Sequence, residues 1–116
     1  MLKTTLTAVV LLLSWVLGSI TAAGAPGDAA AHYEQALDHY GRGEFKEAVI
    51  EARNALQQEE NHLPSRILLG EALLSTGRPA AAEQELTAAL GMGADRALVD
   101  LSLARAYMQQ EKYHHL

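Results

Sequence analysis

Residues 63–96 read LPSRILLGEALLSTGRPAAAEQELTAALGMGADR, and the sequence on both sides repeats this stretch with a period of 34 residues. Gly77 has a counterpart in Gly43, one period earlier, and Gly70 has one in Ala104, one period later. The other recurring pairs are Ala48–Ala82, Ala55–Ala89, Leu56–Leu90, Asn61–Asp95, Leu69–Leu103 and Ala72–Ala106. A fixed period of about 20 to 50 residues is typical of proteins in which each repeat stacks on the next. The sequence therefore predicts a stack of repeats.

Turn residues and capping residues recur where a helix–turn–helix unit needs them. Gly43 and Gly77 are expected to end the first helix of a unit, because glycine adopts the left-handed conformation without a steric penalty. Pro79 is expected at the first position of a second helix, where a missing N–H is tolerated. Asn61 and Asp95 precede the next first helix, where their side chains can cap it. The units are thus predicted to be pairs of helices.

Small residues are expected where the two helices of a unit approach closely, because larger side chains would hold them apart. The predicted repeat-packing residues are Ala36, Gly43, Ala48, Ala55, Gly70, Gly77, Ala82, Ala89 and Ala104. The composition is rich in good helix formers such as Ala, Leu, Glu and Gln. Helices are predicted at residues 29–42, 45–59, 64–75, 79–90 and 97–110, with a stub from residue 112. The fold class is all-α.

This 34-residue unit resembles the tetratricopeptide (TPR) repeat, and the resemblance covers residues 29–116. It implies a right-handed α-solenoid of about two and a half repeats, at residues 29–62, 63–96 and, incompletely, 97–116. The last copy holds 20 of the 34 positions. We therefore expect an amino-terminal fragment of a longer solenoid, with a truncated gene as the alternative. The open C-terminal end predicts marginal stability or self-association of the isolated chain.

Four runs resemble a more particular family: NALQQ (54–58), SRILLGEALL (65–74), AAEQEL (81–86) and LARAY (103–107). They are similar to the amino-terminal part of the exported TPR proteins of bacterial PEP-CTERM/exosortase systems, often called PrsT. This resemblance implies export and a link to exopolysaccharide production and surface-protein sorting. Members of that family are described as lipoproteins, whereas this chain has no cysteine. Membrane attachment by acylation is therefore not carried over.

The N-terminal residues are expected to direct export rather than to join the fold. Lys3 precedes an apolar run over residues 6–20, and small residues follow. This is the pattern of a secretory signal peptide, assigned to residues 1–23, with cleavage after Ala23 or Ala25 and a short linker at residues 24–28. An uncleaved membrane anchor is the alternative, because the run is near the lower length limit for spanning a bilayer. Either way, the repeats are expected in the periplasm or cell envelope.

Charge and cysteine content exclude several function classes. Without Lys3, 8 basic residues remain against 14 acidic ones, a net charge of −6. An acidic surface without a basic stripe argues against nucleic acid as a partner. The absence of cysteine excludes disulfides, thiolate catalysis and cysteine-based zinc sites.

No residue pattern indicates catalysis, a cofactor or a metal site. His32 and His39 share a helix face but lie about 10 Å apart along its axis, too far to share one metal ion. The neighbouring His114 and His115 point to different faces, and His62 stands alone. No carboxylate pair lies in an obvious apolar setting that would raise its pKa. We therefore predict a protein that is not an enzyme.

The resemblance to TPR proteins implies that first helices line a concave groove. The family register places these residues in it: Tyr33, Leu37, Tyr40, Ile67, Glu71, Leu74, Leu101, Arg105 and Met108. A mostly apolar groove with one acid and one base predicts an extended or helical peptide as ligand. The alternative is that several of these residues only pack against neighbouring first helices.

Some TPR proteins grip a C-terminal carboxylate with Lys, Asn and Arg side chains. The register places Tyr33, Leu37, Leu68, Leu98 and Ser102 at those positions, and none of them fits. The leading prediction is an exported, non-catalytic scaffold that binds protein or peptide partners. A structural end of a longer TPR array is one alternative. A polysaccharide-binding module is another, although it needs aromatic platforms and the only tryptophan, Trp15, lies in the targeting segment.

Overall fold

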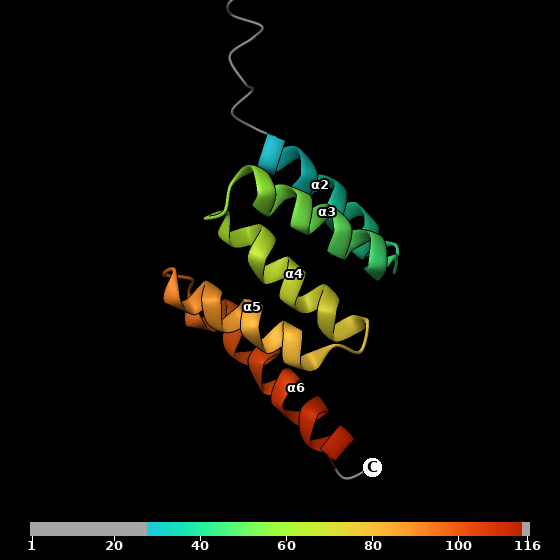
Figure 1. The fold of residues 1–116 in the computed structure, drawn as a ribbon, viewed down its shortest axis with the longest axis vertical. Coiled ribbons are helices and arrows are strands. Elements are labelled where there is room, and N and C mark those ends of the chain that lie inside the picture. The colour runs from blue at the N-terminus through green and yellow to red at the C-terminus, as the bar shows by residue number, and fades with distance from the viewer. Residues whose placement is uncertain (1–27, 115–116) are drawn as a thin grey trace, which may run out of the picture.

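The computed structural model describes residues 28–114, which form five α-helices joined by short turns (Figure 1). They are α2 (Asp28–Gly41), α3 (Phe45–Gln58), α4 (Leu63–Ser75), α5 (Pro79–Gly91) and α6 (Arg96–His114). Within these residues the chain forms no strand, so the all-α prediction is confirmed. The signal peptide or anchor predicted for residues 1–23, and most of the linker, lie outside the described residues. Of the helices between residues 28 and 114, none combines the length and apolar character that a bilayer crossing requires.

The first four helices begin and end within one residue of their predicted bounds. The last prediction was wrong: instead of a helix over residues 97–110 and a separate stub, α6 is one unbroken helix. The cause lies at the position that ends first helices in the other units. Gly43 and Gly77 have their counterpart in Glu111, a good helix former that offers no left-handed residue at which to turn.

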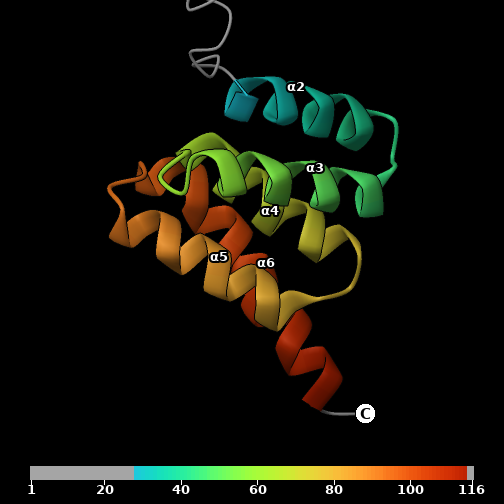
Figure 2. The ribbon, with the colours of Figure 1, turned by 45° about the horizontal axis from the view of Figure 1, so that its top comes forward.

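The helices stack in chain order, each against the next (Figures 1 and 2). The pairs α2–α3 and α4–α5 are helix–turn–helix units, and α6 packs on α5 as the first helix of a third unit. In addition, α4 touches both α2 and α6. One side of the solenoid is therefore built from first helices alone.

Three turns end their helices in the same way. Gly43, Gly77 and Gly93 have φ angles of 77°, 76° and 95°, in the left-handed region. In each turn the glycine N–H donates to the carbonyl three residues back, at 3.0–3.1 Å, and the next N–H donates to the carbonyl five residues back, at 2.8–2.9 Å. This is the Schellman motif, which satisfies carbonyls left free at a helix end. The sequence pattern predicted this role for Gly43 and Gly77 but not for Gly93.

The two expected capping residues behave differently. The Ala97 N–H donates to Asp95 Oδ1 at 3.0 Å, so Asp95 caps the start of α6. Asn61 does not cap α4, because the helix begins at Leu63, one residue earlier than predicted, and His62 is its N-cap residue, without a side-chain cap bond. Instead, His62 Nδ1 lies 2.7 Å from the Ser65 hydroxyl oxygen.

The core is built from small side chains between helices and leucines along α4. Of the predicted packing residues, Ala36, Ala48, Ala55, Ala82 and Ala89 are fully buried, and Gly70 is buried as well. Gly43 and Gly77, also predicted to be packing residues, are exposed in the turns described above. Ala104 is exposed as well, on α6. It occupies the register position of Gly70, but among the described residues no second helix packs against it. Leu68, Leu69, Leu73 and Leu74 make α4 the centre of the core.

Candidate functional site

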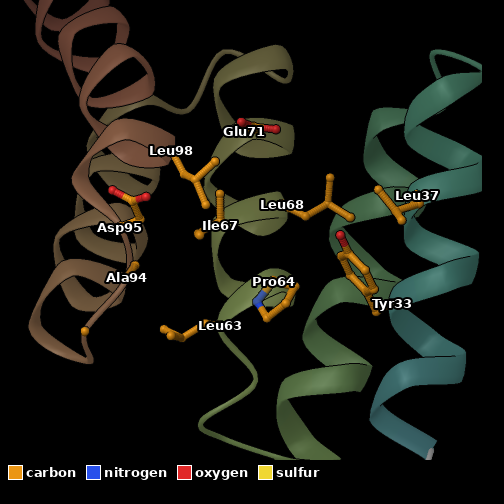
Figure 3. Close-up of a pocket in the computed structure, with 11 residues that line it drawn as sticks. Tyr33, Leu37, Leu63, Pro64, Ile67, Leu68, Glu71, Ala94, Asp95 and Leu98 are labelled. Atoms are coloured by element: carbon orange, nitrogen blue, oxygen red, sulfur yellow. The ribbon is translucent and has the colours of Figure 1, made fainter.

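A concave cavity of about 460 Å³ lies on the side of the solenoid formed by first helices (Figure 3). Three first helices, α2, α4 and α6, contribute to its wall, together with the turn between α5 and α6. The lining residues are Tyr33, Leu37, Leu63, Pro64, Ile67, Leu68, Glu71, Gly93, Ala94, Asp95 and Leu98.

The cavity is formed because helical spacing brings equivalent residues to one face. Residues three or four positions apart lie above one another on a helix, as Tyr33 and Leu37 do on α2. The positions one period later, Ile67 and Glu71, lie on the same side of α4. Leu98 is in turn the counterpart of Pro64. In Figure 3 the α4 residues lie between Tyr33 and Leu37 on one side and Asp95 and Leu98 on the other.

Aromatic packing holds one end of the wall in place. The rings of Tyr33 and His62 meet edge to face, with centroids 5.5 Å apart and an interplanar angle of 61°. His62 is itself linked to Ser65, which is fully buried. Tyr33 is therefore supported by the start of α4, and a half-buried tyrosine with a supported ring is a rigid surface for a ligand.

The charged groups of the cavity wall are both acidic. The Ser102 hydroxyl donates to Glu71 Oε1 at 3.4 Å, and Asp95 accepts the capping bond described above. No ion pair joins either carboxylate to a cation among the residues that the structure describes. The cavity is thus an apolar surface with two carboxylates whose charge is not neutralised within the described chain.

Four of the nine predicted groove residues line this cavity: Tyr33, Leu37, Ile67 and Glu71. Leu74 does not, because only 3% of it is exposed and it belongs to the core. Tyr40 lies near the end of α2 and packs edge to face on Phe45 across the turn, with centroids 5.1 Å apart.

The three predicted groove residues of the third unit lie on the surface outside the cavity. They are Leu101, Arg105 and Met108, all exposed on α6. A groove wall needs a first helix on each side, and among the described residues none follows α6. As a result, α6 contributes only Leu98, on its edge next to α4.

The predicted groove did not include the remaining lining residues. Leu68 and Leu98 were recognisable from the family register, since they occupy positions where a carboxylate clamp would have polar or basic side chains. Tyr33 and Leu37, which also line the cavity, occupy two more of these positions. Ser102 occupies the fifth, and its hydroxyl donates to Glu71 in the cavity wall. Residues 93–95 belong to a turn, and no sequence pattern showed that this turn would close one side of the cavity.

Of the histidines whose side chains the structure describes, His32 and His39 lie beside carboxylates and His62 lies beside a hydroxyl. His32 Nδ1 lies 2.7 Å from Glu51 Oε2, and His39 Nδ1 lies 3.2 Å from Glu44 Oε2. Across the described part of the chain, no three side chains of the metal-binding types come together.

Comparison with known protein families shows a similarity over much of the chain. The family model described as "Tetratricopeptide repeat" matches residues 39–105, more than half of the chain. No curated protein and no solved structure matches the chain significantly.

Proposed function

Because the chain belongs to the tetratricopeptide repeat family, we propose that it is a non-catalytic scaffold whose concave cavity binds a segment of a partner protein. The observation that carries this proposal is the wall itself. Apolar side chains of α2, α4 and α6 converge on a cavity of about 460 Å³. A concave, mostly apolar surface with few polar groups is the usual form of a binding site.

The chemistry of the wall defines the partner segment. Leu37 and Leu98 are 42% and 62% exposed, so their apolar surface is available to a ligand. Glu71 and Asp95 favour a lysine or arginine on the segment that binds. A segment that ends in the cavity with its own C-terminal carboxylate is disfavoured, because both charged groups of the wall are acidic.

We further propose that this scaffold acts outside the cytoplasm, in the periplasm or cell envelope, in an exosortase-related or exopolysaccharide-related system. Two features of the sequence support this. Lys3 and the apolar run at residues 6–20 have the pattern of an export signal. The runs at residues 65–74 and 81–86 resemble the exported TPR proteins of PEP-CTERM systems.

The cavity proposal can be tested by selecting peptides from a random library on the 116-residue chain. Selected peptides should combine apolar residues with lysine or arginine. Their affinity, measured by fluorescence anisotropy, should fall about tenfold or more in the Leu98→Asp variant, because an apolar contact is replaced by a desolvated charge.

The matched control is Ile50→Asp on α3. Ile50 is similarly exposed, at 56%, but does not line the cavity. Equal losses in both variants, or peptides without basic residues, would contradict the proposed role of the cavity.

A further inference from the structure

A second pocket, of about 290 Å³, shares no residue with the cavity of the first helices. It lies between α3 and the turn that joins α4 to α5, so it spans the junction of the first two units. Its lining residues are Lys46, Val49, Ile50, Arg53, Thr76 and Arg78. Both helices of each of these units are described, so the pocket is formed where one complete unit stacks on another.

Three of the six lining residues are cations, although the protein as a whole carries a net charge of −5. Lys46, Arg53 and Arg78 are all exposed, and none of them forms an ion pair with another described residue. The spacing along α3 gives the reason, because no carboxylate stands three or four residues from Lys46 or Arg53. The pocket therefore gathers positive charge that no ion pair within the described chain neutralises.

Two of these cations stand at helix starts, where positive charge is unfavourable. Lys46 is the second residue of α3, and Arg78 is the N-cap residue of α5, without a side-chain cap bond. The N-terminal end of a helix dipole is positive, and Ser, Thr, Asp or Asn is favoured at an N-cap. Both charges therefore cost the fold stability where they stand, and an anion bound beside them would offset that cost.

The next junction in the stack lacks these charges. The residues one period after Lys46 and Arg53 are Ala80 and Thr87, which are neutral. There the two units are joined directly, because the Gln110 side-chain amide donates to a carboxylate of α5 at 2.6 Å. Stacking of one unit on the next therefore does not require basic residues at these positions.

The spacing of the cations and the apolar surface between them define the ligand. Lys46 and Arg53 are seven residues apart on one helix, about 10 Å along its axis, which suits a ligand with separate carboxylates better than a single anion. Between them lie Val49, which is buried, and Ile50, which is 56% exposed. No aromatic ring lines the pocket, so a sugar chain would find nothing on which to stack.

We propose that Lys46, Arg53 and Arg78 form a second binding site, which takes an acidic segment of a partner protein with an apolar residue lying on Ile50. Charge complementarity would give the site its specificity, and burial of apolar surface would add affinity. The cavity of the first helices favours basic segments, because its own charged groups are acidic. The two sites thus select segments of opposite charge.

The probe is a labelled peptide with four glutamates around one leucine, GEELEEG in one-letter code. One control peptide replaces every glutamate by glutamine, and another replaces the leucine by serine. Binding to the 116-residue chain is measured by fluorescence anisotropy at low salt, because salt screens exposed charges. The glutamine peptide should bind about tenfold more weakly than the probe, and the serine peptide about threefold more weakly.

Charge reversal on the protein locates the contact. Arg53→Glu should weaken binding of the probe about fivefold or more, because attraction becomes repulsion. The matched control is Arg105→Glu, since Arg105 is also exposed on a helix and outside any ion pair among described residues, but does not line the pocket. Lys46→Glu guards against a loss through unfolding. It should weaken binding while the melting temperature stays equal or rises, because an acid suits the first turn of α3.

Two further substitutions separate this site from the cavity proposed above. Ile50→Asp should reduce binding of the probe, since it places a negative charge in the pocket, whereas Leu98→Asp should leave it unchanged. Peptides selected for the cavity should show the opposite dependence. Either site can therefore fail its test while the other passes.

Any of four results would overturn the proposal. The probe could fail to bind, or Arg53→Glu and Arg105→Glu could weaken it equally, which would mean that net charge alone attracts it. The serine peptide or a polyuronate chain could bind as tightly as the probe, which would mean that any polyanion is accepted. Light scattering could instead show a dimer that Lys46→Glu disperses, which would mean that the acidic surface of a second copy occupies the pocket.

Discussion

Leu86 on α5 occupies the space that a side chain on Gly70 of α4 would need. A Cβ at Gly70 would lie 2.6 Å from Leu86 Cγ and 2.7 Å from Leu86 Cδ2. Such distances require one of the two helices to move, because Cγ is not the free end of a flexible chain. Glycine is therefore required at this position by close approach and not by backbone conformation.

Gly70→Ala is expected to destabilise the fold. The overpacking against Leu86, about 1–3 kcal/mol, exceeds what alanine contributes as a better helix former, about 0.5–1 kcal/mol. Urea unfolding of the chain measures the change. Gly91→Ala is the control, since nothing lies within 4 Å of a Cβ there, and it should be neutral or slightly stabilising.

The same contact predicts a coupling between two substitutions. Leu86→Ala alone should cost about 2–5 kcal/mol, because it leaves a cavity in the core. Combined with Gly70→Ala, it should cost clearly less than the sum of the single changes, since the added methyl group fills part of that cavity. Additive losses would mean that the two positions do not share this space.

Gly77→Ala is expected to destabilise the chain by about 1–2 kcal/mol, because the residue has a φ of 76° and alanine pays a steric penalty there. Thermal unfolding followed by circular dichroism measures the effect. Gly41→Ala serves for comparison, since that glycine is helical with open space around it. If both changes have the same effect, the left-handed turn is not the cause.

Asn61 and Asp95 occupy the same position in successive repeats, but they should differ in how much they stabilise the helix that follows. Asp95→Ala removes the bond from the Ala97 N–H and should cost about 1 kcal/mol. Asn61→Ala should change the free energy of unfolding by less than about 0.5 kcal/mol, since Asn61 makes no capping bond. Chemical unfolding of both variants provides the comparison, and a larger loss for Asn61→Ala would contradict the structure.

The ion pair Arg66–Glu85 is expected to stabilise the fold more than the pair Arg42–Asp38. Arg66 and Glu85 are 15% and 28% exposed, against 62% and 59% for Arg42 and Asp38. Glu85→Gln should cost about 1–2 kcal/mol, because the guanidinium group is left without its charged partner. Asp38→Asn should cost about 0–0.5 kcal/mol. Similar small effects in unfolding experiments would show that solvent screens both pairs.

Ala82 and Ala104 were both predicted to be packing residues, but only Ala82 is buried in the structure. Ala82→Leu should destabilise the fold by about 1–3 kcal/mol or more, since Ala82 is fully buried between helices. Ala104→Leu should change stability by less than about 0.5 kcal/mol, because Ala104 is exposed. Circular dichroism melting curves give both values.

The sequence by itself determined the helices and their order. Gly43, Gly77 and Pro79 act within a few residues of their own positions, so the 34-residue pattern was enough to locate four helices to within one residue. The error in α6 has the same local origin. Glu111 stands where a glycine would have ended the helix, and this difference was visible in the sequence.

The tertiary structure alone decided what each register position contacts. Ile67 and Glu71 line the cavity, while Leu74, predicted on the same face, is buried in the core. Ala104 is exposed although its counterpart Gly70 is buried. The physical reason is that burial depends on which other helix covers a position. A repeat pattern shows that two positions are equivalent on their own helices, but it does not show which neighbours surround them.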